Sequence, residues 1–476
     1  MVFSSITFLF VFLPVVLLGY LLLRGTVLRN LFLLAASLFF YYWGEPSFLV
    51  VMLASILWNY LGGIACGTAK GKGLRKGCMI VAVVGNLLLL FVYKYLDFGI
   101  SLINGVFRTS LPLYGIALPI GISFFTFQGL SYVIDVYRGQ VPMQKNPLYI
   151  ALYISMFPQL IAGPIVRYID VEKQITNRRV TLDKFYEGVL RFTVGLFKKA
   201  VIANTLALPA DKIFAQDPGA LSLPVAWLGA ILYTMQIFFD FSGYSDMAIG
   251  LGHMFGFTFL ENFSYPYIAK SVKEFWRRWH ISLSTWFRDY LYIPMGGSRR
   301  GNVYLHLIIV FFLTGLWHGA SLNFIVWGLW HGAFLLLERV WSKKHTFRNP
   351  DNILAQTAQH LYTMLVVVIG WVFFRADDLS YACRYLKTMF IGNSGGTILY
   401  DVPYYADGFV LFVLFLAFLI SAEAFPRLGQ LLTRGSCSGR TWFYITGKNM
   451  GIAALLLICA MFVMTSTYNP FIYFRF

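Results

Sequence analysis

Three histidines lie in or beside long apolar runs, where an ionisable side chain needs a chemical reason. His318 stands in LTGLWHGAS, about 15 residues into an apolar run that starts at Val303. Ionisable groups at membrane depth are expensive and usually serve a function. Desolvation can tune an imidazole for general base catalysis. We therefore predict that His318 is a catalytic base; the alternative is a hydrogen-bonded core histidine.

The other two histidines can be explained without a catalytic role. His280 lies in WRRWHISLS, at the centre of an aromatic and basic stretch, so it could equally be a surface histidine. His331 repeats the WHGA tetrapeptide of His318, and for it we expect a packing role. No histidine pair has HxxxH spacing and no cysteine accompanies one, so we predict no metal site.

The composition is that of a membrane protein. The chain has 476 residues, of which 58% are hydrophobic and only 12% charged. An ordinary soluble domain carries about twice that share of charge. Apolar runs of spanning length recur from end to end, so we predict an all-α polytopic protein with about 11–13 membrane helices plus re-entrant segments. No linker or soluble insertion is visible, and residues 1–476 are expected to form a single integral-membrane domain.

The net charge of +17 does not indicate nucleic acid. The basic residues cluster in short loops between apolar runs, which is the positive-inside pattern and also suits anionic membrane lipids. The loops at Arg24 and at Gly67–Lys76 therefore lie inside, and the acidic stretch Ala376–Asp407 lies outside. The last span, Gly451–Thr465, then leads outward.

The stretch Lys270–Asn302 must position the histidines from the inner side. It holds seven basic residues and two acids, which is too polar to cross a membrane. Its tryptophans and phenylalanines predict a partly embedded amphipathic segment on the cytoplasmic face.

Two further patterns concern backbone rather than side-chain chemistry. The segment Pro147–Tyr168 is interrupted by Pro158, Gly163 and Pro164 and flanked by basic residues on both sides, so we predict a re-entrant segment. The GNSGG of Gly392–Gly396 matches GxSxG, but no strand precedes it. We therefore expect a glycine-rich turn rather than a nucleophile elbow.

Taken together, several long motifs resemble the membrane-bound O-acyltransferase superfamily, in particular its bacterial branch that O-acetylates extracellular polysaccharide. They are EFWRRWHISLSTWFRDYLYIPMGGSRRG, LTGLWHGASLNFIVWGLWHG, FPQLIAGPIVRY, NFSYPY, WVFFRADDL and the closing NPFIYFRF. The resemblance covers nearly the whole chain. It implies a bowl of tilted helices around a central tunnel that joins the two membrane faces.

The resemblance also implies an activity and roles for residues. It implies a bacterial cytoplasmic-membrane O-acetyltransferase that takes acetyl from cytoplasmic acetyl-CoA, without a bound cofactor, and delivers it to envelope acetyltransferase partners. His318 matches the family's catalytic base, and His280 matches a polar position on the inner side of the tunnel. The basic inner segment suits a polyanionic donor. Its expected donor-binding residues are Lys273, Arg277, Arg278, Trp279 and Arg288.

The tail offers a way to carry acetyl outward. Tyr473 lies a few residues past the last span, on the expected outer side. A phenol ester keeps a high transfer potential, and a base-activated tyrosine can act as a covalent nucleophile. The related D-alanyl branch is expected to use a tail tyrosine in this way. We predict that Tyr473 carries acetyl, with Tyr468 as a rival and an interfacial anchor as the alternative.

Two other functions stay open at this point. One is D-alanyl transfer to teichoic acid from a carrier-protein thioester. The other is a transporter or flippase, for which broken helices and the intramembrane Asp240 and Asp246 would be suitable.

Overall fold

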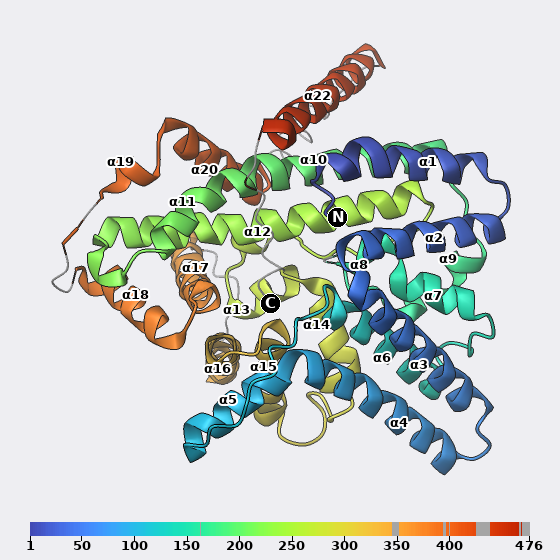
Figure 1. The fold of residues 1–476 in the computed structure, drawn as a ribbon. Helices are drawn as coiled ribbons and strands as arrows, with labels where there is room; N and C mark the ends of the chain where they lie inside the picture. The colour runs from blue at the N-terminus through green and yellow to red at the C-terminus, as the bar shows by residue number, and fades with distance from the viewer. Residues whose placement is uncertain are drawn as a thin grey trace. The chain divides into compact units, whose positions relative to one another are not determined.

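The computed structural model describes residues 1–161, 163–344, 352–393, 397–398, 400–424, 438–465 and 468, with the side chains of 343–344 and 438–445 left aside. In this part of the chain the regular elements are all helices (Figure 1). Within the described residues, six helices are long and apolar enough to cross a membrane, and three shorter apolar helices accompany them. The all-α, multi-pass fold class is thereby confirmed.

The described residues form two compact units. The first comprises Met1–Phe192 and Tyr244–Glu261, and the second comprises Thr193–Gly243 and Asn262–Phe476. The prediction of one domain is not tested by this division, and the tunnel at the centre of a bowl stays a prediction.

The first unit is built from membrane helices and a broken segment. Its helices are α1 (Leu13–Leu22), α2 (Thr26–Gly44), α3 (Leu49–Thr68), α4 (Lys72–Leu90), α5 (Leu96–Phe107), α6 (Ile122–Arg138), α7 (Pro147–Ser155), α8 (Phe157–Leu160), α9 (Tyr168–Thr176) and most of α10 (Leu182–Phe197). Helix α6 packs against α3 and α4 and is buried along most of its length. The expected break in Pro147–Tyr168 is confirmed, since α7 ends at Ser155 and a short α8 follows with Pro158 near its start.

The residues before α6 are extended rather than helical. Helix α6 begins at Ile122, although the apolar run starts at Leu113. The carboxylate of Asp97 accepts the backbone N–H groups of Tyr114 and Gly115 at 2.9 and 2.8 Å. Two N–H groups of the extended backbone therefore have an acceptor without a helix.

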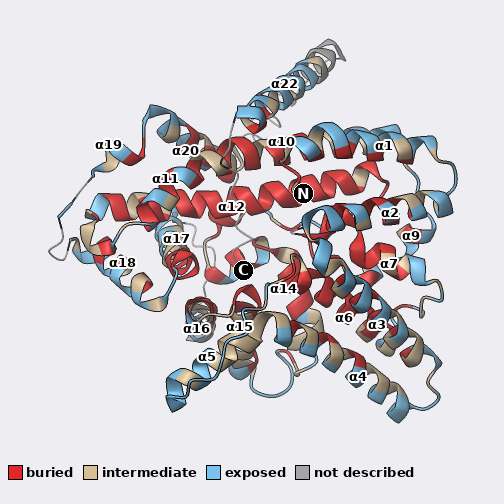
Figure 2. Ribbon diagram, viewed as in Figure 1, coloured by how far each residue is buried: buried red, intermediate tan, exposed pale blue. Residues whose placement is uncertain are grey.

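The second unit holds the histidines. Its helices are α11 (Asn204–Phe214), the first two-thirds of α12 (Leu223–Met254), α13 (Val272–Arg278), α14 (Ile281–Phe287), α15 (Val303–His318), α16 (Leu322–Lys344), α17 (Ile353–Arg375), α18 (Leu379–Ile391), α19 (Val402–Tyr405), α20 (Gly408–Ser421) and α22 (Ser438–Thr465). Figure 2 shows α12 buried along nearly its whole length. Helix α22 begins well before the Gly451 that we predicted.

Within the second unit a buried ion pair holds α12 in place. Lys199 lies in a π-helical turn, Lys198–Ala203, and its Nζ is 2.5 Å from Asp240 Oδ1 of α12. Both side chains are almost fully buried. A charge this deep needs its partner, so the ion pair accounts for Asp240 as part of the packing.

Candidate active site

His318 is the last residue of α15, and its side chain is buried. Its imidazole ring lies in a box of aromatic rings, with centroids 5.0 Å from Trp327, 5.1 Å from Phe374 and 4.9 Å from Trp317. Water is largely excluded from such a box, which strengthens every polar interaction inside it. The prediction that His318 lies in an apolar interior therefore agrees with the structure.

Close packing of α15 on α16 fixes the position of His318. A methyl group on Gly315 would lie 2.3 Å from the backbone oxygen of Phe324, and one on Gly328 would lie 2.2 Å from that of Phe311. Small residues at these points let the two backbones approach, as in other membrane helix pairs. Gly315 and Gly328 therefore bring backbone to backbone about one turn before His318.

His280 occupies a strained turn between α13 and α14. Its φ is +43°, in the left-handed region that a residue with a side chain rarely adopts. The ring is buried, and its Nδ1 lies 3.1 Å from Asn262 Oδ1. The same oxygen accepts the backbone N–H and the hydroxyl of Ser282 at 3.2 and 2.8 Å. Strained backbone of this kind often marks a functional site.

These contacts define the tautomer of His280. Because Asn262 Oδ1 accepts from Ser282, His280 Nδ1 must be the N–H donor, and Nε2 presents a lone pair. Nε2 has no hydrogen-bond partner among the described residues. Burial lowers the pKa of His280 to about 3, so the ring is neutral at physiological pH.

The two histidines come together in the structure. The ring centroids of His280 and His318 are 6.5 Å apart, and Trp317 lies beside both. They are 38 positions apart in the sequence (318 − 280), and we expected His280 nearer the inner mouth and His318 deeper. The structure places them as neighbours among buried aromatic rings, with Phe241 packed edge-on against His280 at 4.6 Å. Their relative depth in the membrane stays a prediction.

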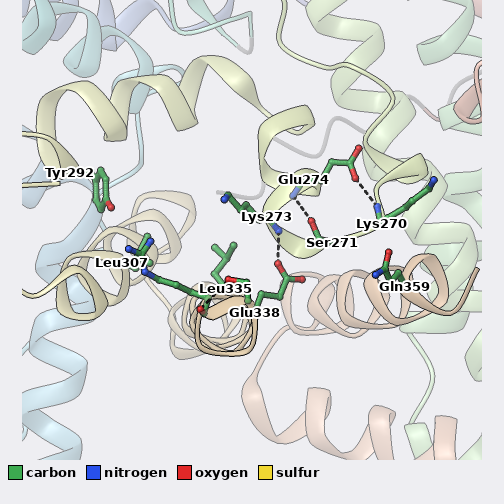
Figure 3. Close-up of a pocket in the computed structure, with 11 residues that line it drawn as sticks. Lys270, Ser271, Lys273, Glu274, Tyr292, Leu307, Leu335, Glu338 and Gln359 are labelled. Carbon is green, nitrogen blue, oxygen red and sulfur yellow. Dashed lines mark hydrogen bonds between the residues drawn. The ribbon is translucent and has the colours of Figure 1, made fainter. Parts of the chain in front are cut away.

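A cavity of about 780 Å³ opens beside α13 and α16. Figure 3 shows its lining, in which Lys273 lies near Glu338 and Lys270 near Gln359. Three cationic side chains line it: Lys270, Lys273 and Arg339. The two carboxylates in the lining accept backbone hydrogen bonds. Glu338 accepts from the N–H groups of Val272 and Lys273, and Glu274 accepts from that of Lys270.

The predicted donor-binding residues divide into three groups. Lys273 lines the cavity, and Arg277 is exposed on the same helix. Arg278 and Arg288 are engaged in ion pairs, with Glu274 at 2.9 Å and Asp289 at 2.7 Å. Trp279 is buried among aromatic rings, 4.7 Å from Trp371, and does not line the cavity. Donor binding by all five stays a prediction.

Sequence reasoning missed some residues of this site. Among the motifs above, Asn262 stands only within NFSYPY and Lys270 only at the start of a basic stretch, and Arg339 belongs to none of them. The conjunction of Asn262 with a histidine 18 residues later has no helical period that could have revealed it. Tyr473 and the second half of GNSGG lie outside the described residues; Gly392, at its start, follows helix α18 rather than a strand.

Comparison with known proteins identifies the family. The profile of "MBOAT, membrane-bound O-acyltransferase family" matches residues 37–374, which include both His280 and His318. The chain belongs to this family. It is therefore a multi-pass membrane enzyme and an O-acyltransferase, which replaces the transporter hypothesis.

Several individual proteins are similar to this chain over half of its length or more. A probable alginate O-acetylase of Pseudomonas putida is 42% identical, and the alignment covers 100% of both chains. A peptidoglycan O-acetyltransferase of Helicobacter pylori is 33% identical over 100% of this chain and 98% of its own. A teichoic acid D-alanyltransferase of Bacillus subtilis is 29% identical over 55% of this chain and 70% of its own. Of these three proteins, the two that align with this chain end to end are named as O-acetylating enzymes.

Proposed function

We propose that this MBOAT enzyme moves acetyl from cytoplasmic acetyl-CoA through the bacterial cytoplasmic membrane for O-acetylation of an extracellular or periplasmic polysaccharide. The observation that carries this is the buried pair of neighbouring histidines, in a chain that is similar over its full length to polysaccharide O-acetylases. Alginate and peptidoglycan, named for those relatives, are both candidate polymers.

The histidines supply the acid–base chemistry. His318 takes the proton of an acceptor hydroxyl while the oxygen attacks the thioester carbonyl carbon. The carbon–sulfur bond breaks, and the leaving thiolate receives the same proton from the imidazolium. The products are an acetyl ester and a free thiol, with no net proton released. His280, neutral and presenting Nε2 as an acceptor, is suited to orient the acceptor hydroxyl toward His318.

The basic cavity supports a phosphate-bearing donor. Lys270, Lys273 and Arg339 supply positive charge, while the neighbouring carboxylates already accept backbone hydrogen bonds. Ammonium and guanidinium groups are the side chains that recognise phosphates. Coenzyme A carries its phosphates at the end remote from the thioester, so it would place them here and its acyl end toward the histidines.

The tail supports an acyl-carrier step. Tyr468, the last described residue, donates a hydrogen bond to Asp211, and Asp211 pairs with Arg375 at 2.5 Å. This clamp ties the chain to α11 and α17 five residues before Tyr473 (473 − 468). We propose that Tyr473 accepts acetyl through its phenol oxygen and that separate envelope acetyltransferases collect it outside.

Purified enzyme in vesicles tests the function. Labelled acetyl-CoA should give thiol release and label transfer to a hydroxyl acceptor, whereas D-alanyl carrier thioester should not. His318→Ala and His318→Gln should each lower the rate by about 10²–10⁴, because glutamine keeps polarity but cannot serve as a base. Near-normal transfer by either folded variant would refute the role of His318, and use of the D-alanyl donor alone would favour the teichoic acid reaction.

A further inference from the structure

One side-chain oxygen, Asn262 Oδ1, faces three hydrogen-bond donors at the His280 turn. It lies 3.2 Å from the backbone nitrogen of Ser282, 2.8 Å from the Ser282 hydroxyl and 3.1 Å from His280 Nδ1. A backbone N–H can only donate, so the amide of Asn262 must turn its oxygen rather than its nitrogen toward this group. Asn262 is almost fully buried, so water hardly competes for this oxygen. The amide orientation, and with it the proton on His280 Nδ1, is therefore determined by the backbone of the turn.

Backbone hydrogen bonds from the segment Asn262–Ser264 bind the same turn on both sides of His280. The N–H of Ile281, just after His280, donates to the backbone oxygen of Asn262 at 2.9 Å. On the other side of His280, the backbone oxygen of Arg278 accepts from the N–H of Ser264 at 2.9 Å. These contacts offset the conformational cost of the positive φ of His280, which is +43°.

Phe263, in the middle of this segment, packs it against its surroundings. Its ring centroid is 4.9 Å from that of Phe241 on α12 and 5.1 Å from that of Trp279 in the turn. Phe241 also contacts the His280 ring at 4.6 Å. The segment is therefore packed between α12 and the turn that it supports.

Arg278 joins the segment to α13. Its Nη1 donates to the backbone oxygen of Ser264 at 3.0 Å, and its Nε and Nη2 lie 3.0 and 2.9 Å from Glu274 Oε1. Each guanidinium nitrogen thus has a partner within the protein. Lysine has the charge but not the planar fork, so it could not bind both partners in this way. This geometry favours support of the turn over binding of a donor phosphate.

We propose that Asn262 and Arg278 are positioning residues for acyl transfer, which together keep His280 in place with Nε2 toward the reacting groups. The inference rests on the proposed function, in which neutral His280 orients the acceptor hydroxyl. Without the oxygen of Asn262 the proton can move to Nε2, which then presents an N–H in place of a lone pair. Without the fork of Arg278 the turn loses a connection to α13. Both changes leave the donor cavity intact, so they should act on kcat rather than on KM for the donor.

Variants of the purified, full-length enzyme in vesicles test these roles. Asn262→Leu removes the acceptor at similar size, whereas Asn262→Asp keeps it and adds a negative charge. Arg278→Lys keeps the charge and removes the fork. Asn177→Asp, at an exposed position, is the control for the added charge. Gly451→Ala in α22 is a general control, because its methyl group would meet no atom within 4 Å.

The donor is chosen with the wild-type enzyme, which is given acetyl-CoA and a D-alanyl carrier thioester in separate assays. The thioester that it accepts is then used for every variant. The wild type thus decides which donor is used, and the variants decide the positioning roles. Nitrogen NMR of isotope-labelled histidine, assigned with His280→Asn, reads the tautomer of His280 without any donor.

Asn262→Leu and Arg278→Lys should each lower kcat about tenfold or more, with KM for the donor unchanged, because each loses hydrogen bonds that orient His280. Asn262→Leu should also lose the Nδ1-protonated tautomer. In Asn262→Asp the carboxylate raises the pKa of His280, so activity should be lost at a higher pH than in wild type as the pH is lowered. His318, the titratable ring beside His280, is the same in both proteins. A role in folding alone would not shift this profile.

Thermal unfolding verifies that each variant is folded, and Asn262→Asp carries the test if Asn262→Leu does not fold. A wild-type pH profile in Asn262→Asp, or wild-type kcat in folded Asn262→Leu, would overturn the role of Asn262. An Nε2-protonated His280 in the wild type would do the same. Unchanged kcat in Arg278→Lys, with or without a raised KM for the donor, would overturn the role of Arg278.

Discussion

His280 is held in one tautomer by Asn262, and its burial has a consequence for stability. Its pKa in the folded chain is about 3, against about 6.5 for an unfolded histidine. Below pH 6.5 the unfolded chain binds a proton that the folded chain does not, so stability falls as pH drops from 6.5 toward 3. The slope reaches about 1.4 kcal/mol per pH unit at most.

This gives a prediction for His280→Asn. The variant keeps a polar group but cannot take up the proton, so its melting temperature should fall less between pH 7 and pH 5 than that of the wild type. Unfolding followed by fluorescence in detergent at the two pH values measures this difference. Equal falls in both proteins would mean that His280 is not held neutral by burial.

Tyr473 is tested by removing one oxygen. Tyr473→Phe keeps the ring and should stop delivery of acetyl to acceptors outside, because no phenol ester can form. Tyr468→Phe is the comparison, since it removes the rival hydroxyl and the hydrogen bond to Asp211. Acetylation of the glycan in cells is the measurement. Wild-type acetylation in Tyr473→Phe would assign the tail to anchoring and place the carrier elsewhere.

At the scale of elements, the glycine contacts between α15 and α16 are the feature that sets the site. Gly315→Ala would put a methyl group 2.3 Å from the backbone of Phe324, so the helices must separate. We expect a loss of about 1–3 kcal/mol in stability and a larger loss of activity than of fold, because His318 lies one turn further on the same helix. Thermal unfolding and transfer rates, compared with Gly451→Ala, measure both. Unchanged activity would show that the helix contact does not position His318.

The sequence was informative where a pattern is local. The apolar run from Val303 predicted α15, and Pro158 predicted the break after α7. It was less informative where distant residues meet. Contacts between distant parts of the chain, which no sequence period encodes, bring together several features of the site. These are the neighbouring rings of His280 and His318, the acceptor Asn262 and the aromatic rings around His331. Likewise, the sequence suggested that Arg278 and Arg288 are available to bind an anionic donor, but in the structure each forms an ion pair with an acidic residue.

For the whole molecule, the loop charges predict that the donor cavity opens on the cytoplasmic side. Single cysteines at the exposed Lys273 and Arg277 should then resist an impermeant thiol reagent added to intact cells and react after permeabilisation. A cysteine at the exposed Tyr404 should react from outside. Labelling of position 273 or 277 in intact cells would show that this face lies outside. The inferred direction of acetyl movement would then be wrong.

Helix α15 has a consequence for the surrounding lipid. With 16 residues it is only about 24 Å long, and Leu305, Ile308 and Phe312 form an exposed stripe along it. An average hydrocarbon core of about 30 Å is thicker than this helix is long, so we expect lipid beside it to thin. Vesicles of short-chain lipids should therefore support faster transfer than vesicles of long-chain lipids at equal protein content. Bilayer thickness would then act on this enzyme as a substrate-independent control of rate.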